Sequence, residues 1–406
     1  MDTNLQRHTS RVSPTGPQMV RQLNRRLVLD LFRDGEERSR ADIARQTGLT
    51  KPSASAITDE LLAEELLVPT GVGSVGATGG RRPNLLRYNS RCRAYVGVYF
   101  GVQRTVVSIA DALGRPLARA AAASSVGDPE RGVRAVRALV TRASARAEIS
   151  LERLASVGVA VAGLVDHRSG TCLLAPNLGW RDVALRERVE ELLGAPTTVY
   201  NEAHAGALAE RHSGVATEVD SFVRLTIGTG VGSGVVVDSQ LFAGSTGIAG
   251  EVGHCRVEDD GLDCACGNTG CLETVASAPA ITRAVDEALE RGEISSLRPG
   301  SHVRLIVDSA RQGDDPARAA LTRAGHGLAR GISYLLNVLN PELIVIGGAV
   351  QDAGGLLLDP IQEELPRSSL PQNRGCEIVM SSLPDAELDG AVLLARRLDE
   401  AATQAG

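Results

Sequence analysis

Apolar residues recur at helical spacing near the start of the chain, after a polar leader. Residues 1–18 are mostly polar and contain prolines, so we expect a disordered leader. Over residues 21–35 the pattern predicts a helix that ends before a glycine. Its apolar stripe consists of Leu23, Leu27 and Leu31, with Val28 and Phe32 beside it.

Two further helices are predicted from their start and stop signals. The first begins at Ser39, which stands three residues before Asp42 in capping-box spacing, and it closes on Gly48. The second takes Thr50 as its N-cap, with Pro52 in its first turn. Its inward-facing apolar residues are Ile57, Leu61 and Leu62.

These two helices have the lengths of a helix-turn-helix motif, whose second helix places its N-terminal residues in the major groove of DNA. The candidate DNA contacts there are Lys51, Ser53, Ser55 and Thr58. Residues 70–89 then predict a glycine-rich hairpin wing, and Arg81 and Arg82 at its tip suit phosphate or minor-groove contact. We therefore expect a winged helix-turn-helix domain over residues 19–90. A small helical domain with a glycine-rich linker is the alternative.

From residue 94 onward, apolar runs of strand length alternate with helical stretches, which is typical of an α/β architecture. Strands are expected within residues 94–120, 155–166, 221–242 and 341–350, and helices within residues 184–194 and 315–340. Between two of the strands, Gly228, Gly230 and Gly232 permit a turn whose backbone N–H groups converge on an anion. The same glycines also suit a tight hairpin.

Composition and charge narrow the class of protein. The chain is 43% hydrophobic and 23% charged, as ordinary globular proteins are. It has no long apolar run and no signal-peptide pattern, so we expect a cytoplasmic protein with no membrane segment. The net charge of −6 conceals an asymmetry, because residues 1–90 carry 13 Arg and Lys against 10 Asp and Glu. A basic head on an acidic body fits a polyanionic partner.

Three cysteines in "CACGNTGCLE" and a nearby histidine predict a metal site. Three thiolates and one imidazole complete a closed tetrahedral zinc shell, which is the structural type. The predicted ligands are His254, Cys264, Cys266 and Cys271. A Cys-Xaa-Cys redox pair is the competing interpretation, and Cys255 is an alternative ligand. A metal here would also hold Glu251 and Glu273 in place as hydrogen-bond acceptors for sugar hydroxyls.

The segment "GTGVGSGVVVDSQLFAGSTGIAGEVGH", followed by "CACGNTGCLE", resembles the ROK family of repressors, open reading frames and kinases. The resemblance covers residues 94–395, and the winged helix before it resembles that of the repressor branch. It implies a two-lobed actin-like or hexokinase-like domain over residues 94–406, with sugar bound between the lobes. It also implies a homodimer or a tetramer.

Carried over to this sequence, the resemblance implies both the metal ligands and the sugar contacts. The zinc ligands would again be His254, Cys264, Cys266 and Cys271. The sugar contacts would be Asn177, Asn201, Glu251, His254 and Glu273. In this pattern His254 serves both sites, with one ring nitrogen for each.

Departures from the kinase pattern favour a regulator over an enzyme. Where the kinases' first phosphate motif has an acid, a second glycine and a threonine, this chain has Tyr99, Val102 and Gln103. Loss of these groups removes support for metal and phosphate, so we expect no ATP binding at this loop. Glu202 stands where the kinases have the aspartate that acts as catalytic base, and its extra methylene displaces the carboxylate. We therefore expect Glu202 to accept a hydrogen bond from a sugar hydroxyl instead of acting as a base.

Together these observations predict a sugar-responsive transcriptional repressor with palindromic operator DNA and a small-molecule sugar as partners. A sugar kinase with an appended DNA-binding domain is the second hypothesis. A head that binds another protein in place of DNA is the third.

Overall fold

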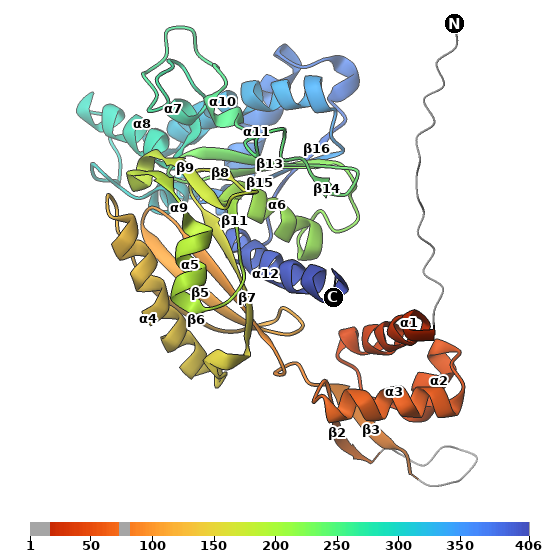
Figure 1. Cartoon of the computed structure of the whole chain (residues 1–406). Coiled ribbons are helices and arrows are strands. Elements are labelled where there is room, and N and C mark those ends of the chain that lie inside the picture. The colour runs from red at the N-terminus through yellow and green to blue at the C-terminus, as the bar shows by residue number, and fades with distance from the viewer. Residues whose placement is uncertain (1–16, 73–81, 406) are drawn as a thin grey trace, which may run out of the picture. The chain divides into compact units, whose positions relative to one another are not determined.

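The computed structural model describes residues 17–72 and 82–405, and the chain divides between Arg93 and Ala94 into two units. The N-terminal unit packs three helices against a sheet of strand order β1-β3-β2 (Figure 1). Its elements are α1 (Pro17–Leu31), β1 (Arg38–Ser39), α2 (Arg40–Thr47), α3 (Lys51–Ala63), β2 (Leu67–Val72) and β3 (Asn84–Tyr88). Helices and hairpin strands follow the order that the sequence predicts.

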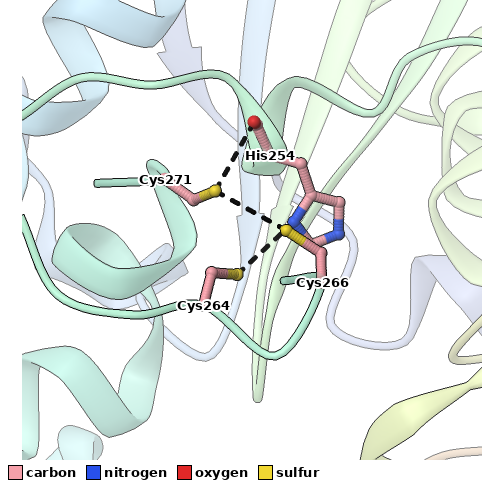
Figure 2. A group of neighbouring side chains, drawn as sticks. All are labelled: His254, Cys264, Cys266 and Cys271. Atoms are coloured by element: carbon pink, nitrogen blue, oxygen red, sulfur yellow. Dashed lines mark hydrogen bonds between the residues drawn. The ribbon is translucent and has the colours of Figure 1, made fainter. Parts of the chain in front are cut away.

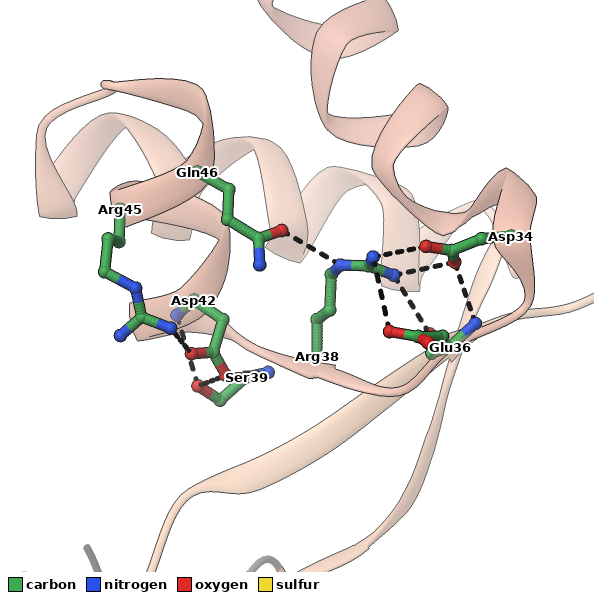
Figure 3. Close-up of polar contacts among 7 residues, drawn as sticks. All are labelled: Asp34, Glu36, Arg38, Ser39, Asp42, Arg45 and Gln46. Carbon is green, nitrogen blue, oxygen red and sulfur yellow. Dashed lines mark hydrogen bonds and ion pairs between the residues drawn. The ribbon is translucent and has the colours of Figure 1, made fainter.

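Polar contacts fix the start of α2 (Figure 3). The Asp42 backbone N–H donates to Ser39 Oγ at 3.2 Å, and the Ser39 N–H donates to Asp42 Oδ2 at 3.1 Å, which completes the predicted capping box. Arg38 donates to Asp34 Oδ1 at 2.8 Å and to Gln46 Oε1 at 3.0 Å. These contacts join the end of the first helical segment to α2.

Helix α1 buries a different face from the one its leucines predict. Val28 and Phe32 are fully buried, whereas Leu23 and Leu27 are 61% and 43% exposed. The predicted stripe was wrong at Leu23 and Leu27, although Leu31 packs against the core, because only the C-terminal end of α1, from Val28 onward, reaches the core of this unit. Because α1 begins at Pro17, the last two residues of the expected leader are helical, and residues 1–16 lie outside the described residues.

The C-terminal unit has two lobes, each built on a five-stranded sheet. The first lobe has strand order β11-β7-β4-β5-β6, the second has β14-β13-β12-β15-β16, and β10-β9-β8 form a small sheet. The strands are β4 (Ala94–Phe100), β5 (Arg104–Asp111), β6 (Pro116–Ala123), β7 (Leu154–Val161), β8 (Leu164–Asp166), β9 (Thr171–Ala175), β10 (Trp180–Val183), β11 (Thr197–Asn201), β12 (Phe222–Ile227), β13 (Val231–Val237), β14 (Gln240–Leu241), β15 (Leu343–Gly348) and β16 (Glu377–Met380).

Helices cover both sheets and join the two lobes (Figure 1). They are α4 (Pro129–Ala147), α5 (Leu185–Leu193), α6 (Glu202–Ser213), α7 (Glu273–Ala276), α8 (Ala278–Glu290), α9 (Val303–Arg311), α10 (Asp315–Leu339), α11 (Gly355–Glu364) and α12 (Ala386–Ala405). Helix α6 packs on β12 and β13 of the second lobe, α12 packs on β4 and β7 of the first, and the two helices pack on each other. Strands alternating with helices confirm the α/β prediction.

The two joining helices cross at small residues. A Cβ placed on Gly390 of α12 would overlap the backbone carbonyl of Ala205 in α6. The lobes therefore meet through closely approaching backbones. In the part of the chain that the structure describes, no helix combines the length and the apolar character that a membrane span requires.

Candidate functional site

The side chains predicted as metal ligands lie together in the loop between β14 and α7 (Figure 2). Each offers one donor atom, and all four donor atoms lie within 4.8 Å of one another. The residues are His254, Cys264, Cys266 and Cys271. Two short antiparallel bridges fold the loop back on itself, one joining Arg256 to Cys271 and the other joining Asp263 to Thr269. The loop thus brings together ligands that are up to 17 positions apart in the sequence.

The spacing of these donor atoms fits a tetrahedral zinc ion. Sulfur ligands at about 2.3 Å from zinc lie about 3.8 Å from each other in a tetrahedron. Cys266 Sγ and Cys271 Sγ are 3.8 Å apart, and Cys264 Sγ lies 3.7 Å from His254 Nδ1. Burial, followed by the neighbouring thiols, raises the pKa of Cys271 to about 12, so a bound cation is what would hold this sulfur as a thiolate.

The alternatives for the cysteines gain no support. Cys255 is outside the four-residue cluster and packs against the core of the second lobe. In a Cys264–Cys266 redox pair, His254 and Cys271 would have no role, yet both lie within the cluster. The donor set therefore favours metal binding over redox chemistry.

Two carboxylates lie beside the metal ligands. His254 Nε2 is 4.0 Å from Glu251 Oε2, while Nδ1 of the same ring faces Cys264, so the two ring nitrogens face different groups. Glu273 Oε2 accepts a hydrogen bond from the Val231 N–H at 3.1 Å. Burial, and then the neighbouring Glu273 carboxylate, raise the pKa of Glu251 to about 7. This arrangement presents hydrogen-bond acceptors beside an imidazole N–H.

The turn between β12 and β13 makes room for one of these acids. The two strands pair from Phe222↔Val236 to Ile227↔Val231, so the glycine-rich segment forms a tight hairpin. A Cβ on Gly230 would overlap the Glu273 carboxylate and would lie 3.9 Å from Asn177 Nδ2. Asn177 is exposed in a short helical turn after β9. The structure therefore brings Asn177 close to Glu273.

Asn201 has a structural role at the start of α6. Its Oδ1 accepts from the Ala203 N–H at 2.7 Å, which caps the helix, and its Nδ2 donates to Gly163 O at 2.8 Å. In the same turn, His204 Nε2 lies 3.0 Å from Ala249 O, in the loop that leads to Glu251. The first turn of α6 thus positions segments on both sides of the predicted sugar contacts.

Glu202 has a partner that the sequence did not indicate. The Tyr99 hydroxyl donates to Glu202 Oε2 at 2.7 Å. These residues occupy two of the positions at which the chain departs from the kinase pattern. Burial, and then the Glu387 carboxylate, raise the pKa of Glu202 to about 7.

A buried ion-pair network lies beside Glu202 and was also missed from the sequence. The Arg224 side chain is 1% exposed, and it pairs with Glu387 at 2.9 Å and with Glu210 at 3.5 Å. The sequence feature that could have indicated this network is an arginine inside the apolar strand "SFVRLTIG". A buried charge without an ion-pair partner would destabilise the fold.

The two predicted phosphate loops approach each other. A cavity of about 320 Å³ is lined by Gln103, which follows β4, and by Thr229 in the β12–β13 turn. Helix α8 supplies several of the other lining residues. The structure thus keeps space where the kinase pattern has phosphate loops, while Tyr99, Val102 and Gln103 change the residues of the first loop.

The predicted DNA contacts do not all lie at the surface. Lys51 and Ser53 are exposed in the first turn of α3, and Arg82 is exposed before β3. Ser55 is partly buried and accepts from Arg40 at 2.7 Å. Thr58 is fully buried and donates to Ala54 O, so it was wrongly predicted as a DNA contact. Arg81 lies outside the described residues.

Comparisons with known proteins agree with this geometry. The ROK family profile matches residues 95–397. The chain belongs to the ROK family. A relative described as a xylose repressor, from Caldicellulosiruptor bescii, is 32% identical over 378 residues, which cover 90% of this chain and 93% of the relative.

Two solved ROK structures have the same fold. A ROK family transcriptional regulator, described as a homologue of the E. coli MLC protein, superposes with a TM-score of 0.73 at 27% identity and covers 94% of this chain and 99% of its own. A ROK family glucokinase from Streptomyces griseus, solved in complex with glucose and AMPPNP, superposes with a TM-score of 0.68 at 32% identity. The match covers 75% of this chain and 99% of the glucokinase chain. The two-lobed actin-like architecture is thereby confirmed.

Proposed function

We propose that this ROK protein is a sugar-responsive, DNA-binding transcriptional repressor of carbohydrate-utilisation genes. The observation that carries the proposal is the extent of the match to regulators, which includes the N-terminal unit. The transcriptional regulator covers 94% of this chain, whereas the glucokinase covers 75%. The exposed Lys51 and Ser53 on α3 and the exposed Arg82 supply the chemistry that a major-groove helix and a wing require.

In this proposal the C-terminal unit binds the sugar beside a structural zinc ion. His254, Cys264, Cys266 and Cys271 would hold the metal, whose binding energy would fix the loop that carries the sugar contacts. Glu251 and Glu273 accept hydrogen bonds from sugar hydroxyls, and His254 Nε2 lies beside the Glu251 carboxylate. Asn177, Asn201 and Glu202 complete the predicted contacts, and the Asn201 side chain also caps α6.

A sugar kinase with an appended DNA-binding unit is the second candidate, favoured by the similarity to the glucokinase. Two contacts weigh against it. Tyr99 replaces the acid of the kinases' first phosphate loop, and its phenol ring lies against Gly101 of that loop. Glu202 replaces the catalytic aspartate and accepts a hydrogen bond from the Tyr99 hydroxyl. Incubation with Mg-ATP and a sugar panel should yield no sugar-dependent ADP, and turnover at about 1 per second or faster would establish the kinase.

The direct test is binding to the DNA upstream of the gene's own operon. Fluorescence anisotropy should show salt-sensitive binding to a palindromic site, as expected when a dimer presents one winged helix to each half-site. Addition of D-xylose, D-glucose or N-acetylglucosamine should change that affinity by about 5- to 150-fold for one of the sugars. Absence of specific DNA binding would favour a protein-binding head.

A further inference from the structure

The residues that replace two kinase positions contact each other at the ends of two strands of the first lobe. Tyr99 belongs to β4, and Glu202 is the first residue of α6 and directly follows β11, which lies in the same sheet as β4. The phenol donates to the Glu202 carboxylate at 2.7 Å. Because Gly101 lacks a side chain, the Tyr99 ring has room there, since a Cβ at Gly101 would lie 2.8 Å from the ring.

Charges around this hydrogen bond do not balance. Arg224 is the guanidinium paired with both Glu210 and Glu387, so one cation serves two carboxylates. Glu202 is a third carboxylate in the same region and has the Tyr99 hydroxyl as its hydrogen-bond donor. Glu210 also accepts from Ser381, and Arg224 donates to Thr226. The network therefore holds more acidic than basic groups, and Glu202 is the acid with the weakest compensation.

We propose that Tyr99 and Glu387 are positioning residues that set the ionisation of Glu202, and that sugar affinity therefore changes with pH. The inference rests on the proposed sugar site, in which the ionised Glu202 accepts a hydroxyl. Tyr99 favours the ionised form by donating a hydrogen bond, and Glu387 opposes it by like-charge repulsion.

The electrostatics of each group agree with these roles. Burial and Glu387 raise the pKa of Glu202 to about 7, while the Tyr99 hydrogen bond and Arg224 act in the opposite direction. Burial and the Glu202 carboxylate raise the pKa of Tyr99 well above its usual value, although Arg104 lowers it, so the phenol keeps its proton. His204, two residues after Glu202, has its pKa lowered by burial, which favours its neutral form.

The sign of the pH effect follows from the ionised acceptor. Above about pH 7 Glu202 is ionised and accepts a hydrogen bond from the sugar hydroxyl. Below this pH, protonation of Glu202 lowers the affinity for sugar by up to about tenfold per pH unit. Removal of the Tyr99 hydroxyl destabilises the ionised form and moves the midpoint to higher pH. Removal of the Glu387 charge stabilises it and moves the midpoint to lower pH.

The experiment is calorimetric titration of the full-length, zinc-loaded protein with the sugar that binds among D-xylose, D-glucose and N-acetylglucosamine, from about pH 5.5 to about pH 8.5. The variants are Tyr99→Phe, Glu387→Gln and Glu202→Gln. We expect midpoints that move in opposite directions for the first two, by about one pH unit each. Glu202→Gln should remove this component of the profile. Glu251 also belongs to the proposed sugar site, and its contribution is common to all variants.

Tyr95→Phe is the matched control, because Tyr95 lies on the same strand and its hydroxyl donates to Asp399 at 3.1 Å. This variant should keep the wild-type midpoint. Thermal unfolding at one pH identifies any variant that has lost its fold. If the sugar binds and the first two midpoints stay at the wild-type value, the inference is wrong while the sugar site stands. If no sugar binds to the wild type, the proposed function itself fails.

Discussion

At the residue scale, the positions of individual cysteines decide between metal binding and spare thiols. Cys266 is exposed at one corner of the cluster, 3.8 Å from Cys271 Sγ, while Cys255 lies outside the cluster. Cys266→Ser should lose the bound zinc, and with it the sugar response, because three ligands hold the loop less tightly. Elemental analysis and sugar titration measure the two losses. Cys255→Ser is the control and should keep its zinc, and equal loss in both variants would assign the ligands differently.

Exposure likewise separates two residues that the sequence placed together at the DNA interface. Lys51→Ala should weaken operator binding and reduce the salt dependence by about one unit of log–log slope, since an exposed cation is lost. Thr58→Val should leave operator affinity unchanged, because the hydroxyl is buried and bonded to Ala54 O. Anisotropy at several salt concentrations measures both. A Thr58→Val variant that keeps its melting temperature but loses DNA binding would contradict this assignment.

Single residues also show what sequence alone can predict about the site. The His254, Cys264, Cys266 and Cys271 cluster was predictable because a loop places residues of known chemistry at short spacing. The Tyr99–Glu202 contact was not, since the partners are 103 positions apart and meet only when β4 and β11 join the same sheet. Thr58 was wrongly placed at the DNA interface because its hydroxyl bonds to the backbone of its own helix. The sequence does not distinguish such a threonine from one whose hydroxyl faces solvent.

At the element scale, helix periodicity predicts that a helix exists more reliably than which face it buries. In α1 and the helical turn Phe32–Asp34 that follows it, both candidate stripes are apolar, and only the contact with the rest of the unit selects Val28 and Phe32 over Leu23 and Leu27. In α2 the capping signals were sufficient, because Ser39 and Asp42 act within one turn. Local signals therefore fix helix starts, and packing fixes helix faces.

The crossing of α6 and α12 opposes local helix propensity. Alanine is favoured over glycine within a helix by about 1 kcal/mol, yet a Cβ on Gly390 would overlap Ala205 O. Gly390→Ala should therefore destabilise the C-terminal unit by about 1 to 3 kcal/mol, despite its better propensity. Chemical denaturation measures this change. Gly375→Ala is the control, because a Cβ there meets no atom within 4 Å, and a more stable Gly390→Ala protein would show that the helices can separate freely.

At the scale of the whole molecule, the order of the two units was predictable from the sequence. The packing of the last helix, α12, on the first lobe was not. A basic, helix-rich head before an α/β body follows from pattern and charge. Helix α12 returns to β4 and β7 of the first lobe, which end 286 and 225 residues before α12 begins. It places Glu387, at the start of α12, beside Arg224 of the second lobe, so the last helix contributes to the contact between the lobes.

A repressor built in this way must show reciprocal coupling between its ligands. If the sugar lowers operator affinity by some factor, saturating operator DNA must lower sugar affinity by the same factor, which for a typical coupling of about 1 to 3 kcal/mol is about 5 to 150. The C-terminal unit alone, residues 94–406, contains the whole predicted sugar and zinc site, so it should bind sugar with an affinity that DNA does not change. Calorimetric sugar titrations with and without operator DNA measure both quantities. Unequal factors in the full-length protein would mean that the assembly changes between the two titrations, because a closed thermodynamic cycle permits no other difference.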